Sequence, residues 1–284
     1  MLYRHFPKIA NKEFSILTLS LENLSLEDEV SIAAMCDLLH TASEYGINLI
    51  HAPSGEAQRA ALLAAFQNAA LRDCFYIIFD FTGTTAPQFD AFLALTGAHP
   101  NNLVCLTIEE SGSLAHYKKE GILTRAENAR NEGRLGCLGF SCPKDSAILT
   151  GVVDGYPEWD FFRMDFSFLD IGLLEAVCHA AVNELGFIPS NPFAGGILLD
   201  PPPSARAFYK NASVPRSCGE WALRALWENQ NVTSIACVPA SPADLTQNAI
   251  FAGAGRPNSL REKELSVLDN ARKTLDTIVQ IQQS

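Results

Sequence analysis

Apolar positions along this chain follow two alternating patterns. Short runs that are apolar at nearly every position are separated by longer stretches in which apolar residues recur at every third or fourth position. The first pattern is typical of strands in a parallel sheet, and the second of amphipathic helices that cover such a sheet. The expected strands are 14–20, 47–50, 75–81, 103–108, 135–140, 160–165, 186–189 and 232–238. The expected helices are 28–45, 56–71, 87–95, 113–133, 144–153, 172–185, 219–229, 242–250 and 260–281, with a loop at 191–203.

The order of these segments predicts the fold class. Each expected strand is followed by a helix, which predicts an α/β protein with a (β/α)8 TIM barrel, formed by a single domain over 1–284. A doubly wound open sheet is the alternative, but no Gly-x-Gly-x-x-Gly motif follows the first strand. The helix at 260–281 lies beyond the last strand-helix unit, so we expect it to pack on the outside of the barrel.

Composition and charge exclude several classes of function. The chain is 48% apolar and carries a net charge of −11, so it lacks the clustered cations that bind nucleic acid or an anionic membrane. No apolar run is long enough to cross a membrane, and no signal-peptide core follows Met1, so we expect a cytoplasmic location. The eight cysteines form no Cys-x-x-Cys pair, which excludes the usual spacing of zinc and iron–sulfur sites.

Several short motifs occur in a characteristic order along the chain. They are Tyr45-Gly46-Ile47-Asn48, Gly139-Phe140-Ser141, Trp159-Asp160-Phe161, Pro192-Phe193-Ala194-Gly195-Gly196 and Glu220-Trp221-Ala222-Leu223-Arg224. Together they resemble the aldo/keto reductase family, most of all its branch of oxidoreductases that often carry a C-terminal ferredoxin-like extension. No cysteine follows Cys237, so that extension is not expected here. The resemblance implies hydride transfer from NADPH or NADH to a carbonyl, with a tyrosine proton donor assisted by a lysine, an aspartate and a histidine.

The catalytic positions that the resemblance implies hold other residues. His51 stands at the aspartate position, Asp80 at the lysine position and Thr107 at the histidine position, and the loop at 52–56 contains no tyrosine. We therefore expect no carbonyl reduction by the family's mechanism. His51 and Asp80 remain the candidate catalytic residues, because they occupy the ends of barrel strands, where active sites of this fold lie.

The cofactor positions are only partly kept. The candidates for cofactor binding are Ser141, Cys142, Arg163, Ser190, Gly195 and Gly196. The resemblance implies that Ser141 would hold a nicotinamide carboxamide, whereas Cys142 and Arg163 replace the usual asparagine and glutamine. Ser190 stands where a ring-stacking aromatic residue often lies, and 240–244 offers no cation for a 2′-phosphate. NADPH is therefore disfavoured, and NADH or a flavin remains a candidate cofactor.

Some of these residues have two interpretations. Cys142, close to a predicted helix start, is either a nucleophile with a lowered pKa or a small residue in a turn. Arg163 either clamps a carboxylate or phosphate of a ligand, or forms an ion pair with Asp165 or Asp80. The two glycines either let backbone N–H groups approach a pyrophosphate or serve only the turn.

Three functions remain open from the sequence. The first is a barrel that has lost the family's reduction and binds a small-molecule ligand or a protein partner. The second is a nicotinamide- or flavin-linked oxidoreductase with another proton donor, such as His51. The third is a metal-assisted hydrolase or lyase using His51 with Asp80, Glu109 or Asp165, although their spacing matches no known metal motif.

Overall fold

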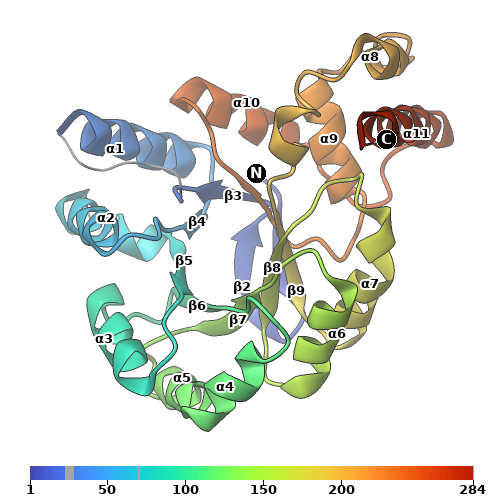
Figure 1. Ribbon diagram of the computed structural model, residues 1–284. Helices are drawn as coiled ribbons and strands as arrows, with labels where there is room; N and C mark the ends of the chain where they lie inside the picture. Colours follow the sequence, from blue (N-terminus) through green and yellow to red (C-terminus); the bar gives the residue numbers. More distant parts are fainter. Residues whose placement is uncertain (23–28, 70, 284) are drawn as a thin grey trace.

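Eight parallel strands form a nearly closed barrel in the computed structural model, which describes residues 1–22, 29–69 and 71–283 (Figure 1). The strands follow one another around the barrel in chain order, and a parallel bridge links Phe187 of the last-but-one strand to Val232, just before the last strand. The predicted (β/α)8 barrel is thus confirmed. The barrel strands are β3 (Leu17–Ser20), β4 (Leu49–His51), β5 (Tyr76–Phe81), β6 (Asn102–Thr107), β7 (Cys137–Ser141), β8 (Phe161–Asp165), β9 (Gly186–Ser190) and β10 (Ile235–Cys237).

Helices surround the barrel on its outer face (Figure 1). The stretch predicted as one helix over 113–133 is two helices, because Gly121 at φ 70° ends the first one. The predicted loop at 191–203 is followed by an unpredicted helix, which begins at Pro203. The helices are α1 (Glu29–Glu44), α2 (Glu56–Ala69), α3 (Ala86–Thr96), α4 (Ser113–Lys119), α5 (Ile122–Asn131), α6 (Ser146–Gly155), α7 (Leu174–Val182), α8 (Pro203–Lys210), α9 (Cys218–Trp227), α10 (Pro242–Ala252) and α11 (Glu262–Gln283). Short 3₁₀ turns are η1 (Arg72–Cys74), η2 (Ile171–Leu173) and η3 (Ala194–Gly196).

A β-hairpin that the sequence pattern did not predict closes one end of the barrel. It consists of antiparallel β1 (Tyr3–Phe6) and β2 (Ile9–Ser15), so the prediction of one strand over 14–20 was wrong. Two rings of the hairpin, Phe6 and Phe14, stack at 4.4 Å and enter the apolar interior at the N-terminal ends of the strands. The hairpin therefore fills this end of the barrel.

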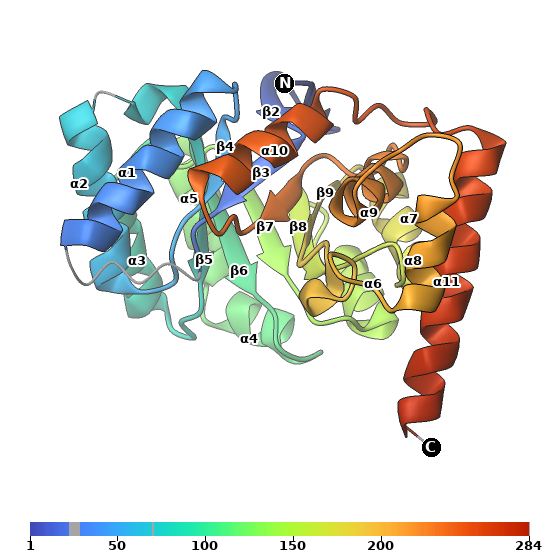
Figure 2. The same cartoon turned by 90° about the horizontal axis from the view of Figure 1, so that it is seen from above.

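The C-terminal helix α11 packs on the outside of the barrel, as predicted (Figure 2). Leu268 and Ala271 of this helix are buried against Trp221 of α9 and Tyr209 of α8. In the part of the chain that the structure describes, no helix has the length and apolar character to cross a membrane.

Candidate functional site

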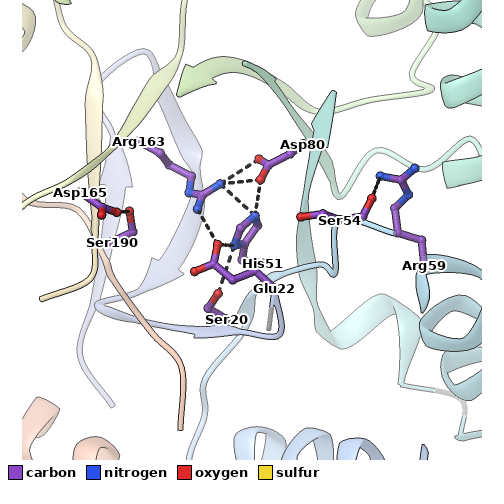
Figure 3. A network of polar contacts seen from close by, with 9 residues as sticks. All are labelled: Ser20, Glu22, His51, Ser54, Arg59, Asp80, Arg163, Asp165 and Ser190. Carbon is purple, nitrogen blue, oxygen red and sulfur yellow. Dashed lines mark hydrogen bonds and ion pairs between the residues drawn. The ribbon is translucent and has the colours of Figure 1, made fainter. Parts of the chain in front are cut away.

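Charged side chains from four parts of the barrel converge at its C-terminal end (Figure 3). His51 is the last residue of β4, and its Nε2 lies 2.7 Å from Oδ2 of Asp80 on the neighbouring strand β5. Arg163 extends across the barrel from β8 and donates from Nη1 to both carboxylate oxygens of Asp80, at 2.8 and 3.0 Å. Glu22, just after β3, completes the charge network, with Oε2 at 3.5 Å from Nη2 of Arg163.

Asp80 is ionised in this network. Burial alone would raise the pKa of its carboxyl, but the Arg163 guanidinium and His51 beside it hold that pKa well below its usual range. Asp80 in turn raises the pKa of Arg163 against the effect of burial. The ion-pair interpretation of Arg163 is therefore confirmed for Asp80, and the alternative pairing with Asp165 does not occur.

Both ring nitrogens of His51 are engaged, and its side chain is fully buried. Oδ2 of Asp80 and Nη1 of Arg163 both lie within hydrogen-bond distance of Nε2, at 2.7 and 2.9 Å. On the other side of the ring, Nδ1 lies 3.1 Å from the Ser20 hydroxyl and 3.4 Å from Oε2 of Glu22. The hollow at the open end is lined by Glu22, Asp80 and Arg163 but not by His51, so a ligand there does not meet the imidazole ring.

The sequence pattern missed Glu22, although its signal was present. Glu22 comes two residues after the last residue of a barrel strand, and the carboxyl ends of parallel strands in this fold face the same opening. Its side chain is 31% exposed, so it is the member of the network that solvent reaches most readily.

A hollow of about 400 Å³ opens beside the network; we call it the central hollow. Its lining includes Ser141, Cys142, Arg163 and Ser190, so four of the predicted cofactor-binding residues do lie together. Burial raises the pKa of the Cys142 thiol to about 12, so this cysteine is not a thiolate at neutral pH. Of its two interpretations, the geometry favours the small buried residue.

The predicted glycine pair lines a second hollow of about 370 Å³, which we call the glycine hollow. Gly195 and Gly196 have φ angles of 67° and 97°, which glycine adopts without strain. Their backbone N–H groups already donate to Asn191 Oδ1 at 2.8 Å and to the Phe193 carbonyl at 3.0 Å. Neither amide is free to bind a phosphate, which favours the turn interpretation of this motif.

Of the residues proposed for a metal site, His51 and Asp80 lie side by side, but Glu109 and Asp165 do not join them. Glu109 lines a separate hollow, the threonine hollow, with Thr82, Thr84 and Thr107. Asp165 instead accepts hydrogen bonds from Ser190 and Asn191. Over residues 1–22, 29–69 and 71–283, no three His, Cys, Asp or Glu side chains are grouped so that they could hold a metal ion.

The lowered pKa of Asp80 predicts how stability depends on pH. The network stabilises the folded chain above the unfolded-state pKa of about 4, and this contribution is lost as the pH falls toward the folded-state pKa. We expect the difference in unfolding free energy between the wild type and Asp80→Asn, measured with urea, to shrink from pH 6 to pH 3. A constant difference over that range would contradict this assignment.

Comparison with known proteins gives matches in structure only. No family model and no curated protein matches the sequence. The holo form of aldo-keto reductase AKR11C1 from Bacillus halodurans has a TM-score of 0.75 over 95% of this chain and 96% of that one, at 16% identity. This chain has the aldo-keto reductase fold. PA4992 of Pseudomonas aeruginosa, assigned to the aldo-keto reductases, has a TM-score of 0.69 over 89% of this chain and 95% of that one, also at 16% identity.

The aldo-keto reductase fold implies a nicotinamide dinucleotide, and the residues present here do not fit its phosphates. The glycine hollow holds the carboxylates of Glu22 and Asp165, and its lining contains no lysine or arginine. It adjoins a hollow of about 320 Å³ that we call the outer hollow; the two share Phe193, Leu199 and Val238. Asp244 is the charged side chain among the described residues that line the outer hollow. A pyrophosphate or 2′-phosphate would therefore meet negative charge along this groove.

Proposed function

We propose that this chain is a binding protein built on the aldo-keto reductase fold, which holds a small organic ligand at the C-terminal end of the barrel without reducing it. The closed charge network at the positions of the family's catalytic residues carries this proposal. A carbonyl reductase needs a proton donor that reaches the substrate. Here Asp80 is ionised, Arg163 is paired, and the side chain of His51 is fully buried.

Tyr117, which lines one of the hollows at this end of the barrel, does not replace the missing donor. Tyr117 of α4 lines the threonine hollow, and its hydroxyl donates to the Thr107 carbonyl at 2.7 Å. Burial, with a contribution from Glu109, raises the pKa of Tyr117 to about 12. A tyrosine that acts as a general acid near neutral pH needs its pKa lowered, so Tyr117 is poorly suited to that role.

The sizes of the hollows support ligand binding. The central, glycine and threonine hollows each have about 370–400 Å³, within the range of small-molecule sites. The central and glycine hollows share Glu22 and Asp165, so one ligand can extend from one into the other. A small molecule therefore suits this end of the barrel better than a protein partner does.

One observation favours the second candidate, an oxidoreductase that still binds a nicotinamide or flavin cofactor. The chain superposes better on the holo form of AKR11C1, with a TM-score of 0.75, than on its apo form, with a TM-score of 0.69. Ser141 also lies in the central hollow, where it could contact such a cofactor.

A titration combined with a turnover assay separates these two functions. We expect neither NADH nor NADPH to be oxidised above background with a panel of aldehydes and ketones, followed by absorbance. We also expect no saturable binding of either dinucleotide in a fluorescence titration, and FMN is titrated in the same way. An active aldo-keto reductase serves as the positive control. Turnover that scales with the concentration of this protein would overturn the proposed function.

A further inference from the structure

Negative charge dominates the open end of the barrel. Acidic side chains line each of the four hollows there among the described residues: Glu22, Asp80, Glu109, Glu110, Asp165 and Asp244. The lysine and arginine side chains in the same linings are Lys144 and Arg163, and both are already paired with carboxylates. Lys144 lies 2.9 Å from Asp170, and Arg163 lies 2.8 Å from Asp80. The electrostatic field of these carboxylates therefore favours a positively charged ligand at the open end of the barrel.

Asp165 is a fixed carboxylate without a cation. Its Oδ1 accepts a hydrogen bond from the Ser190 hydroxyl at 2.8 Å, and its Oδ2 accepts one from Asn191 Nδ2 at 3.3 Å. No lysine, arginine or histidine pairs with it in the described part of the chain, and the residue is exposed. Asp165 is thus held in position where the central and glycine hollows meet.

Glu22, in the network beside Asp165, is only loosely held. The carboxylates of Glu22 and Asp80 face one guanidinium, that of Arg163. Glu22 approaches Arg163 and His51 only at 3.5 and 3.4 Å, longer than a normal charge-assisted hydrogen bond. Glu22 can therefore accept a further donor from the hollows that it lines.

Arg163, which lines the central hollow, has one buried donor atom without an acceptor among the described residues. Nε of Arg163 makes no hydrogen bond within the described residues, although the side chain is only 6% exposed. A buried donor without a partner is costly, by about 1–3 kcal/mol. This atom indicates an acceptor oxygen that the protein itself does not supply, and it does so independently of the acidic residues.

We propose that the open end binds a small organic amine that also carries uncharged oxygen atoms, such as an amino alcohol or an amino sugar. Its ammonium group lies between Glu22 and Asp165, and one of its oxygen atoms accepts a hydrogen bond from the Arg163 side chain. Charge-assisted hydrogen bonds to two carboxylates give selectivity over neutral molecules of the same shape. This inference rests on the proposed function, since it names the class of ligand for the same site.

Three probes with the same carbon chain test the charge preference directly. Glucamine is cationic, sorbitol is neutral and gluconate is anionic, and their affinities are compared by isothermal titration at one pH and one salt concentration. We expect glucamine to bind at least about tenfold more tightly than the other two, a difference of about 1.4 kcal/mol. Equal affinities, tighter binding of sorbitol or gluconate, or no binding of glucamine up to its solubility limit would overturn the proposal.

A pair of variants locates the site. Asp165→Asn should weaken glucamine binding about tenfold, whereas Asp154→Asn, which changes an exposed aspartate of α6, should leave the affinity unchanged. Unfolding curves check that both variants fold, and the comparison of the three probes on the wild type needs no variant. Unchanged glucamine affinity in folded Asp165→Asn would overturn the assignment of this residue. Hydride transfer in the turnover assay would instead overturn the proposed function and leave the comparison of the probes standing.

Discussion

Arg163→Met is expected to lower the free energy of unfolding by about 3–5 kcal/mol, because it removes the cation that compensates two partly buried carboxylates. Asp80 is 16% exposed and depends on Arg163 for two hydrogen bonds, and Glu22 lies 3.5 Å from the same guanidinium. For a chain of this size such a loss corresponds to a fall in Tm on the order of 10 °C. Urea unfolding at pH 7 measures the free energy, and calorimetry measures the Tm.

The double variant Arg163→Met/Asp80→Asn distinguishes an ion pair from simple loss of packing. If the two side chains stabilise the fold mainly through each other, the double variant should lose less stability than the sum of the single variants. Arg125→Met is the matched control, since Arg125 pairs with Asp90 on the surface and should contribute about 0–1 kcal/mol. Additive losses, or a loss for Arg163→Met no larger than for the control, would contradict the role given to the network.

Most of the barrel could be predicted from the sequence because its strands are buried on both faces. An apolar run between two amphipathic stretches has few other structural solutions, and the eight barrel strands lie close to the expected positions. The prediction failed where the local pattern is ambiguous. Phe14 and Ser15 continue the apolar run into β3, yet they pair with β1, and only the tertiary structure decides between the two sheets. Gly121 lies inside a helical pattern, where a glycine can either be tolerated or end the helix.

The candidate site could be predicted only in part. His51 and Asp80 were expected at one end of the barrel because each lies at the end of a strand, and the structure places them 2.7 Å apart. The pairing of Arg163 depends on how far its side chain extends across the barrel, which spacing along the chain does not determine. That Asp165 has no cationic partner among the described residues could not be predicted either, because this depends on which lysine and arginine side chains reach it in the folded chain. Contacts between strands that are not neighbours are therefore the part of the site that the sequence pattern could not supply.

Phe6→Ala is expected to destabilise the fold by about 3–5 kcal/mol, because Phe6 is a fully buried ring that fills the closed end of the barrel. Its ring stacks on Phe14 and on Phe161 of β8, with centroid distances of 4.4 and 5.2 Å. Removing the ring therefore leaves a cavity between these two aromatic side chains. Tyr3→Phe changes an exposed residue of the same hairpin and should cost no more than about 1.5 kcal/mol, since it removes one hydrogen bond, to Gly46.

A double-mutant cycle tests whether the ring of Phe6 limits the space at this end. A Cβ added at Gly186, the first residue of β9, would lie 2.0 Å from Cδ1 of Phe6, so Gly186→Ala alone should destabilise the chain by overpacking. In the Phe6→Ala background that clash is absent, and Gly186→Ala should then cost much less. Urea unfolding of the four proteins measures the coupling. Equal costs of Gly186→Ala in both backgrounds would show that the hairpin does not fill the barrel end, because the ring and the added methyl group would then not compete for the same space.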